Sequence, residues 1–117
     1  MPSITCASRD VLGRQISCLD DICIGIIREL VVNQESGRVR YVIVEPREEA
    51  MGVENGVLAI PWRALSPVTN DPDRAFVLPL LIDDAKQAPT FEAGSWPDFS
   101  NTREMAEVHA FYGEPPA

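Results

Sequence analysis

The feature that most constrains the fold is a pair of apolar stretches separated by a short polar loop. Residues 23–33 (CIGIIRELVVN) and 37–46 (GRVRYVIVEP) are rich in β-branched residues and partly alternate in polarity, a pattern typical of strands and not of helices. The loop at 33–37 (NQESG) ends in Gly37, which tolerates a positive φ. These stretches therefore predict an antiparallel β-hairpin at the centre of the fold.

Each strand of this predicted hairpin carries apolar residues on both of its faces. In the second strand, Val39, Tyr41 and Ile43 lie on one face, whereas the other face starts with arginines and ends with Val42 and Val44. A strand that is apolar on both sides belongs to a sandwich or a small barrel, and not to an open sheet with one wet face. We therefore expect the rest of the chain to cover the hairpin on both sides.

The flanking segments predict further short elements. Apolar runs bounded by turn residues or prolines predict three more strands, at 11–17, 57–65 and 75–82. Pro61 stops the second of these and opens one helical turn, and Pro79 places the third at a sheet edge or interrupts it. A single helical turn is expected at 83–89, and Gly25 indicates a bulge or a tight bend within the hairpin.

The segment 101–113 predicts a C-terminal helix. Asn101 is suited to its N-cap, and Glu104 follows three residues later, as in a capping box. Gly113 is suited to the end of the helix. The apolar face of this helix is formed by Met105, Val108 and Tyr112.

The bulk composition limits the class of protein. A chain of 117 residues with 45% hydrophobic and 24% charged residues fits one globular domain. The net charge of −8 disfavours binding to nucleic acid, which requires clustered basic residues. A local basic patch remains open, the alternative being a solvated strand face; the arginines concerned are Arg28, Arg38, Arg40 and Arg47.

Location and oxidation state are predicted from the same sequence. The longest apolar runs fall short of the roughly 20 residues that span a bilayer, and the first residues lack the pattern of a secretory signal. Three cysteines, an odd number, fit a reducing compartment. We therefore expect a cytoplasmic protein without membrane insertion.

In order along the chain, several motifs resemble those of the PRC-barrel family. The matching stretches are LGRQI, IGIIRELVVN, SGRVRYVIVEP, LAIPWRAL, FVLPLLIDDAKQAPTF and WPD. The family includes the cytoplasmic domain of the photosynthetic reaction-centre H subunit and the C-terminal domain of a ribosome-maturation factor. The resemblance implies a mainly β protein with a small barrel of two short antiparallel sheets, short helices and a C-terminal helix. It covers about residues 10–112 of a single domain spanning 1–117, and it implies that Val42 and Val44 face the second sheet or a dimer partner.

The sequence departs from the family pattern at three points. The stretch LDDI replaces the glycine that usually stands in the turn before the second strand. The membrane helix of the reaction-centre subunit and the companion domain of the maturation factor have no counterpart in the sequence. For these reasons neither specific function is transferred whole.

Residues with catalytic or metal-binding chemistry are sparse. The chain has one histidine, His109, for three cysteines, which are Cys6, Cys18 and Cys23. Their spacing gives neither a zinc-ligand pattern nor a thiolate with a base beside it. Three pairs of adjacent acids are expected to be solvated turn or capping residues; they are Asp20 and Asp21, Glu48 and Glu49, and Asp83 and Asp84. We therefore predict no enzyme activity, no catalytic residue, no cofactor and no metal site.

The two tryptophans and the hairpin supply the candidate binding residues. Trp62 is expected in the core, whereas Trp96 lies in an irregular stretch and either closes an open end of the barrel or anchors a partner. The leading hypothesis is a non-catalytic interaction or assembly module that forms a homodimer or binds another protein, with Trp96, Val42 and Val44 as partner-binding residues. The alternatives are a factor of RNA metabolism or ribosome assembly that binds a basic ribosomal protein, and an accessory protein of photosynthetic or other electron transport.

Overall fold

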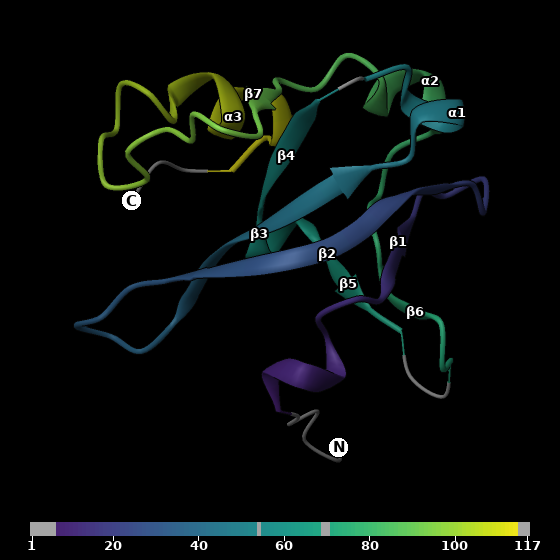
Figure 1. Cartoon of the computed structure of the whole chain (residues 1–117), viewed down its shortest axis with the longest axis horizontal. Helices are drawn as coiled ribbons and strands as arrows, with labels where there is room; N and C mark the ends of the chain where they lie inside the picture. Colours follow the sequence, from purple (N-terminus) through teal and green to yellow (C-terminus); the bar gives the residue numbers. More distant parts are fainter. Residues whose placement is uncertain (1–6, 54, 69–70, 115–117) are drawn as a thin grey trace.

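A computed structural model describes residues 7–53, 55–68 and 71–114. Within these residues the chain forms one seven-stranded mixed sheet with the strand order β5-β6-β1-β2-β3-β4-β7 (Figure 1). The strands are β1 (Gln15–Ser17), β2 (Cys23–Val32), β3 (Val39–Pro46), β4 (Gly56–Pro61), β5 (Ser66–Pro67), β6 (Arg74–Val77) and β7 (Phe91–Glu92). The helices are α1 (Glu48–Met51), α2 (Ile82–Ala85) and α3 (Ala106–Tyr112), with 3-10 turns at Ser8–Asp10 and Trp62–Ala64.

The predicted central hairpin is confirmed. Strands β2 and β3 pair antiparallel from Gly25 opposite Pro46 to Val32 opposite Val39, and Figure 1 shows them as the two long strands at the centre of the molecule. Gly37 ends the connecting loop with a φ of +74°. At Gly25 the two strands approach closely: a Cβ there would lie 2.8 Å from Cγ1 of Val44 and would also overlap the backbone of β3. A glycine is therefore required at this position.

Both faces of the hairpin are buried, as its two apolar faces predict. Val42 and Val44 are fully buried in the larger core, which also receives side chains from β1, β2, β4, β6, α1 and α2. Tyr41 and Ile43 point into a second core, where Met105 and Val108 close the other face of the sheet. The same strand therefore contributes to two cores on opposite sides.

The expected barrel of two antiparallel sheets is wrong for the described chain. A single sheet is present, and β6 joins it by pairing parallel to β1. After β4 the chain passes through the turn at Trp62–Ala64 and through β5, and this path brings β6 back beside β1 instead of starting a second sheet. The sheet is not closed into a barrel, since β5 and β7 lie at its two opposite ends. The pairing of β2 with β1 and its pairing with β3 both contain register shifts, and such shifts bend a strand. Ile16 and Phe76 lie in the same core as Leu58, in line with a bent sheet.

Three elements are shorter than the sequence predicts, and the first is the strand expected at 11–17, which begins only at Gln15. The strand expected at 75–82 ends at Val77, two residues before Pro79, so the proline breaks the strand. The helix expected at 101–113 begins only at Ala106, although Oδ1 of Asn101 accepts hydrogen bonds from the backbone N–H groups of the two residues before Met105. The carboxylate of Glu104 accepts from the N–H of Asp98 instead of completing a capping box. Gly113 ends α3 with a φ of +69°, as predicted.

Candidate functional site

Trp96 lies at the surface beside a groove of about 490 Å³. Its side chain is 43% exposed, and its ring meets Phe99 edge to face with the ring centroids 6.2 Å apart. Phe99 in turn lies 5.8 Å from the ring of Tyr41, which connects the exposed tryptophan to the smaller core. The apolar part of the groove is lined by Ile43, Pro46, Val53, Val57 and Ala93. An exposed aromatic residue and a groove with a partly apolar lining are thus adjacent on one surface.

The rim of this groove carries charges of both signs. Arg28 donates two hydrogen bonds to Oε2 of Glu45, at 2.9 Å from Nε and 2.5 Å from a terminal nitrogen. Both side chains are more than half exposed, so this ion pair contributes little to stability. Glu48, at the start of α1, adds a further carboxylate to the rim. The rim of the groove therefore carries one guanidinium group and two carboxylates, and one of those carboxylates is already paired with the guanidinium.

Of the three residues predicted to bind a partner, only Trp96 is exposed. Val42 and Val44 have no exposed surface, because β1, β6 and the short helices cover their face of β3. Trp62, expected in the core, is half-buried, and its ring meets Phe76 edge to face at 5.1 Å. The hydrophobicity of β3 is thus used within the chain.

A buried tyrosine–histidine pair joins the sheet to α3. The hydroxyl of Tyr41 lies 2.5 Å from Nε2 of His109, and both side chains are more than nine-tenths buried. Nδ1 of His109 has no hydrogen-bond partner within the described residues. Burial raises the pKa of Tyr41, against an opposing effect of the nearby Arg40. In the sequence His109 is a lone histidine on a predicted helix, and its position four residues after Met105, on the apolar side of that helix, is the signal that indicates its burial.

The cysteines differ in their accessibility. Cys18 is fully buried, and burial, followed by the nearby Asp20 and Cys23, raises its pKa to about 11. The Cys18 thiol is therefore protonated at neutral pH. Cys23 is half-buried and directs its Sγ toward the carbonyl oxygen of Gly25 at 3.6 Å. Cys6 lies outside the described residues.

An exposed apolar patch with acidic neighbours lies where the turn between β1 and β2 meets the start of α2. Its apolar members are Leu19, Ile22 and Leu81, which are 59%, 37% and 52% exposed. Two contacts join the segments: the N–H of Leu19 donates to the carbonyl of Leu80, and Asp20 accepts from the N–H of Ile82. The aspartates of this region are Asp20 and Asp21 in the turn and Asp83 and Asp84 in the first turn of α2. We call these residues the acidic patch.

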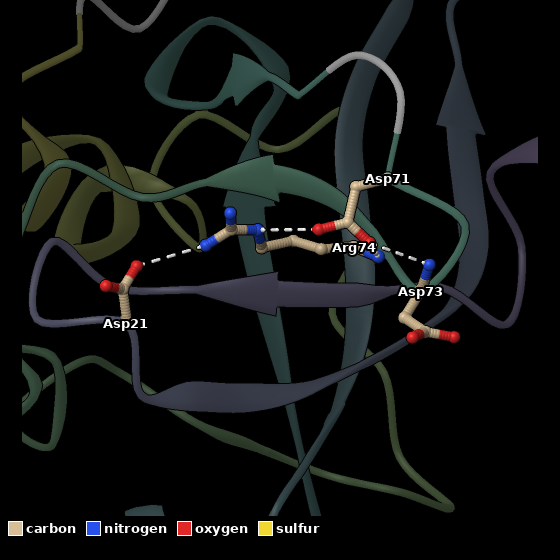
Figure 2. A network of polar contacts seen from close by, with 4 residues as sticks. All are labelled: Asp21, Asp71, Asp73 and Arg74. Carbon is tan, nitrogen blue, oxygen red and sulfur yellow. Dashed lines mark hydrogen bonds and ion pairs between the residues drawn. The ribbon is translucent and has the colours of Figure 1, made fainter.

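Arg74 connects the acidic patch to the loop before β6. Figure 2 shows its guanidinium between Asp21, at 3.2 Å, and Asp71, at 3.5 Å. Asp71 also accepts hydrogen bonds from the backbone N–H groups of Asp73 and Arg74, and these bonds, together with the Arg74 charge, lower its pKa. The network holds the turn that carries Leu19 and Ile22 against β6.

The lengths of the helices, the spacing of possible metal ligands and two comparisons with known proteins bear on the class of protein. Across residues 7–53, 55–68 and 71–114, the helices are all too short to cross a bilayer. In the same ranges, histidine, cysteine and acidic side chains do not gather in threes at a spacing suited to a metal ion. No family model matches the sequence, and no curated protein matches it, so the resemblance to PRC-barrel domains stays a prediction.

Proposed function

We propose that this protein is a non-catalytic interaction module that assembles with a second copy of itself through the groove at Trp96. The observation that carries the proposal is a tryptophan 43% exposed beside a groove that both apolar and charged side chains line. Tryptophan is among the residues that dominate binding energy at protein interfaces. The resemblance to PRC-barrel domains, which occur as parts of larger assemblies, supports the same class of function.

A second copy is the partner favoured by the charges at the groove. A twofold interface brings the same surface of each copy together, so its charges must be self-complementary. The rim of the groove carries Arg28 together with Glu45 and Glu48, so across a twofold axis Arg28 of each copy can face Glu48 of the other while it keeps its pair with Glu45. Two acidic patches would instead bring aspartates against aspartates. With a net charge of −8 per copy, association is less opposed at a surface that includes a positive charge than at one with aspartates alone.

The test is sedimentation equilibrium of the full chain over a range of concentrations. We expect the wild type to dimerise and Trp96→Ala to weaken the dimer by at least about tenfold, a loss of the size seen at interface anchors. Leu81→Ala is the matched control, because Leu81 is similarly exposed but belongs to the acidic patch. A wild type that stays monomeric at the highest concentration, or a dimer that is lost on Leu81→Ala and kept on Trp96→Ala, would refute the proposal.

The acidic patch favours a second candidate function, the binding of a basic protein segment. Exposed leucines next to four aspartates suit a partner that presents apolar residues together with lysines or arginines. A basic ribosomal protein has this chemistry, in line with a role in ribosome assembly. In binding assays with ribosomal proteins, we expect Leu81→Ala to weaken binding and Trp96→Ala to leave it unchanged. If neither salt nor Leu81→Ala nor Trp96→Ala changes the affinity for ribosomal proteins, this candidate function is excluded.

A further inference from the structure

Three arginines converge on a second hollow, of about 500 Å³, in this otherwise acidic protein. Arg38 lines it from the loop just before β3, Arg40 from the second residue of β3, and Arg63 from the 3-10 turn after β4. Trp62 and His109 are also in its lining. Of the chain's ten basic residues, three therefore face one hollow, and the acidic residue in its lining is Glu114. Arginines consequently outnumber acidic residues three to one in this lining.

These three arginines form no ion pair with a carboxylate of the described residues, a property they share with Arg9, Arg14 and Arg103. Arg28, Arg47, Arg74 and Lys86 each form an ion pair with a carboxylate. Within the described ranges, Arg38, Arg40 and Arg63 form none, although acidic residues are nearly twice as numerous as basic ones. Like charges that share a hollow repel one another, and a bound anion relieves that repulsion.

The backbone of β3 determines where Arg40 points. Tyr41 pairs with Val31 and Val39 pairs with Val32, so Arg40 is the extra residue of a bulge. Bulges change the direction of a side chain and bend the strand. The guanidinium of Arg40 consequently lies 5.9 Å from the ring centroid of Tyr41, beside the buried Tyr41–His109 pair. Arg40 is thus held by a rigid part of the fold.

We propose that this hollow binds a small anion that carries two or more linked phosphate groups, as in a nucleoside diphosphate. Guanidinium groups bind phosphate through paired, charge-assisted hydrogen bonds, which makes arginine suited to this recognition. Three positive charges match two linked phosphates better than one. A volume of about 500 Å³ lies within the usual range of ligand pockets and leaves room beside Trp62 for an organic group.

The test is a calorimetric titration of the full chain with inorganic pyrophosphate and with ADP at low ionic strength. Orthophosphate and citrate serve as comparison anions. In the Trp96→Phe variant, Trp62 is the remaining tryptophan, and its fluorescence gives a second readout at the site. We expect one pyrophosphate per chain, tighter binding than that of orthophosphate or citrate, and a change in Trp62 fluorescence.

Substitution of single arginines separates a site from general charge. Arg63→Gln and Arg40→Gln should each weaken pyrophosphate binding by about tenfold, the loss of one charge-assisted interaction. Arg103→Gln is the matched control, because Arg103 is exposed, lies outside the hollow and changes the net charge equally. Equal effects of Arg63→Gln and Arg103→Gln, the absence of pyrophosphate binding, or equal affinity for citrate would each overturn the proposal.

Discussion

Replacing Tyr41 with phenylalanine tests how α3 is attached to the sheet. The substitution keeps the ring, which packs against Phe99 and the smaller core, and removes only the hydroxyl that contacts His109. Helix α3 has seven residues, fewer than an isolated helix needs for stability. It therefore depends on its packing and on this hydrogen bond.

The expected cost follows from the burial of both partners. Tyr41 is 2% exposed and His109 is 7% exposed, so water cannot readily replace the lost hydroxyl. His109 would then have both ring nitrogens without a partner among the described residues. Leaving a buried polar group unsatisfied costs about 1–3 kcal/mol. For a domain of this size that corresponds to a fall in Tm of roughly 4–12 °C.

Urea unfolding at pH 7 and thermal melts measure this cost, and hydrogen exchange locates it. We expect the amides of α3 to exchange faster in Tyr41→Phe, before those of β2 and β3. Tyr112→Phe is the matched control: the hydroxyl of Tyr112 makes no hydrogen bond within the described residues, so its removal should change the free energy of unfolding by less than about 0.5 kcal/mol. In the double variant Tyr41→Phe/His109→Leu, the loss should be smaller than the sum of the single losses. Equal stability of the two tyrosine variants, or strict additivity, would refute the reasoning.

Three further predictions concern other parts of the fold. Gly25→Ala should lower the free energy of unfolding by roughly 3 kcal/mol, because the added Cβ overlaps β3. In the control Gly94→Ala the added Cβ meets nothing within 4 Å, so the free energy of unfolding should not fall. Urea titrations of the two variants measure the difference. Cys18 should resist alkylation at pH 8 until urea is added, and peptide mass mapping measures this. Equal labelling of Cys18 in the native protein and in urea would contradict its burial and its raised pKa. The lowered pKa of Asp71 means that its contribution is present above the ordinary value of 3.8 and is lost as the pH falls through the folded value. Asp71→Asn should therefore be less stable than the wild type at pH 7 and closer to it at acid pH, and parallel pH profiles would show that Asp71 is not responsible.

The sequence predicts the local elements of this fold better than their arrangement. The hairpin of β2 and β3 follows from alternation and from Gly37, signals that lie within a few residues of one another. The parallel pairing of β1 with β6 joins residues about 60 positions apart, and the sequence of neither strand indicates which strand it pairs with. Strands β5 and β7 have two residues each, too few for any periodic pattern. The predicted barrel fails for these reasons, although the burial of both hairpin faces was predictable.

The candidate sites also differ in how far the sequence alone could predict them. Trp96 was identifiable because an aromatic residue in an irregular polar stretch has few neighbours to bury it. Val42 and Val44 were indistinguishable in sequence from interface residues, since the same hydrophobicity serves a core and a partner. The arginine-lined hollow combines residues from β3, the 3-10 turn at Trp62–Ala64 and α3, and only the folded chain brings these together.

The three surfaces differ in charge, and this difference makes their roles separable by ionic strength. At the Trp96 groove salt screens the long-range repulsion between two copies of net charge −8 more than it screens close Arg28–Glu48 contacts across the interface, so salt should strengthen dimerisation. At the acidic patch and at the arginine-lined hollow the partner has the opposite charge, so salt should weaken binding at both. A single protein with net negative charge would therefore give opposite salt dependences for self-association and for pyrophosphate binding. General electrostatic attraction cannot produce that combination, because a net charge of −8 repels pyrophosphate as well as a second copy; only local segregation of the arginines from the aspartates can.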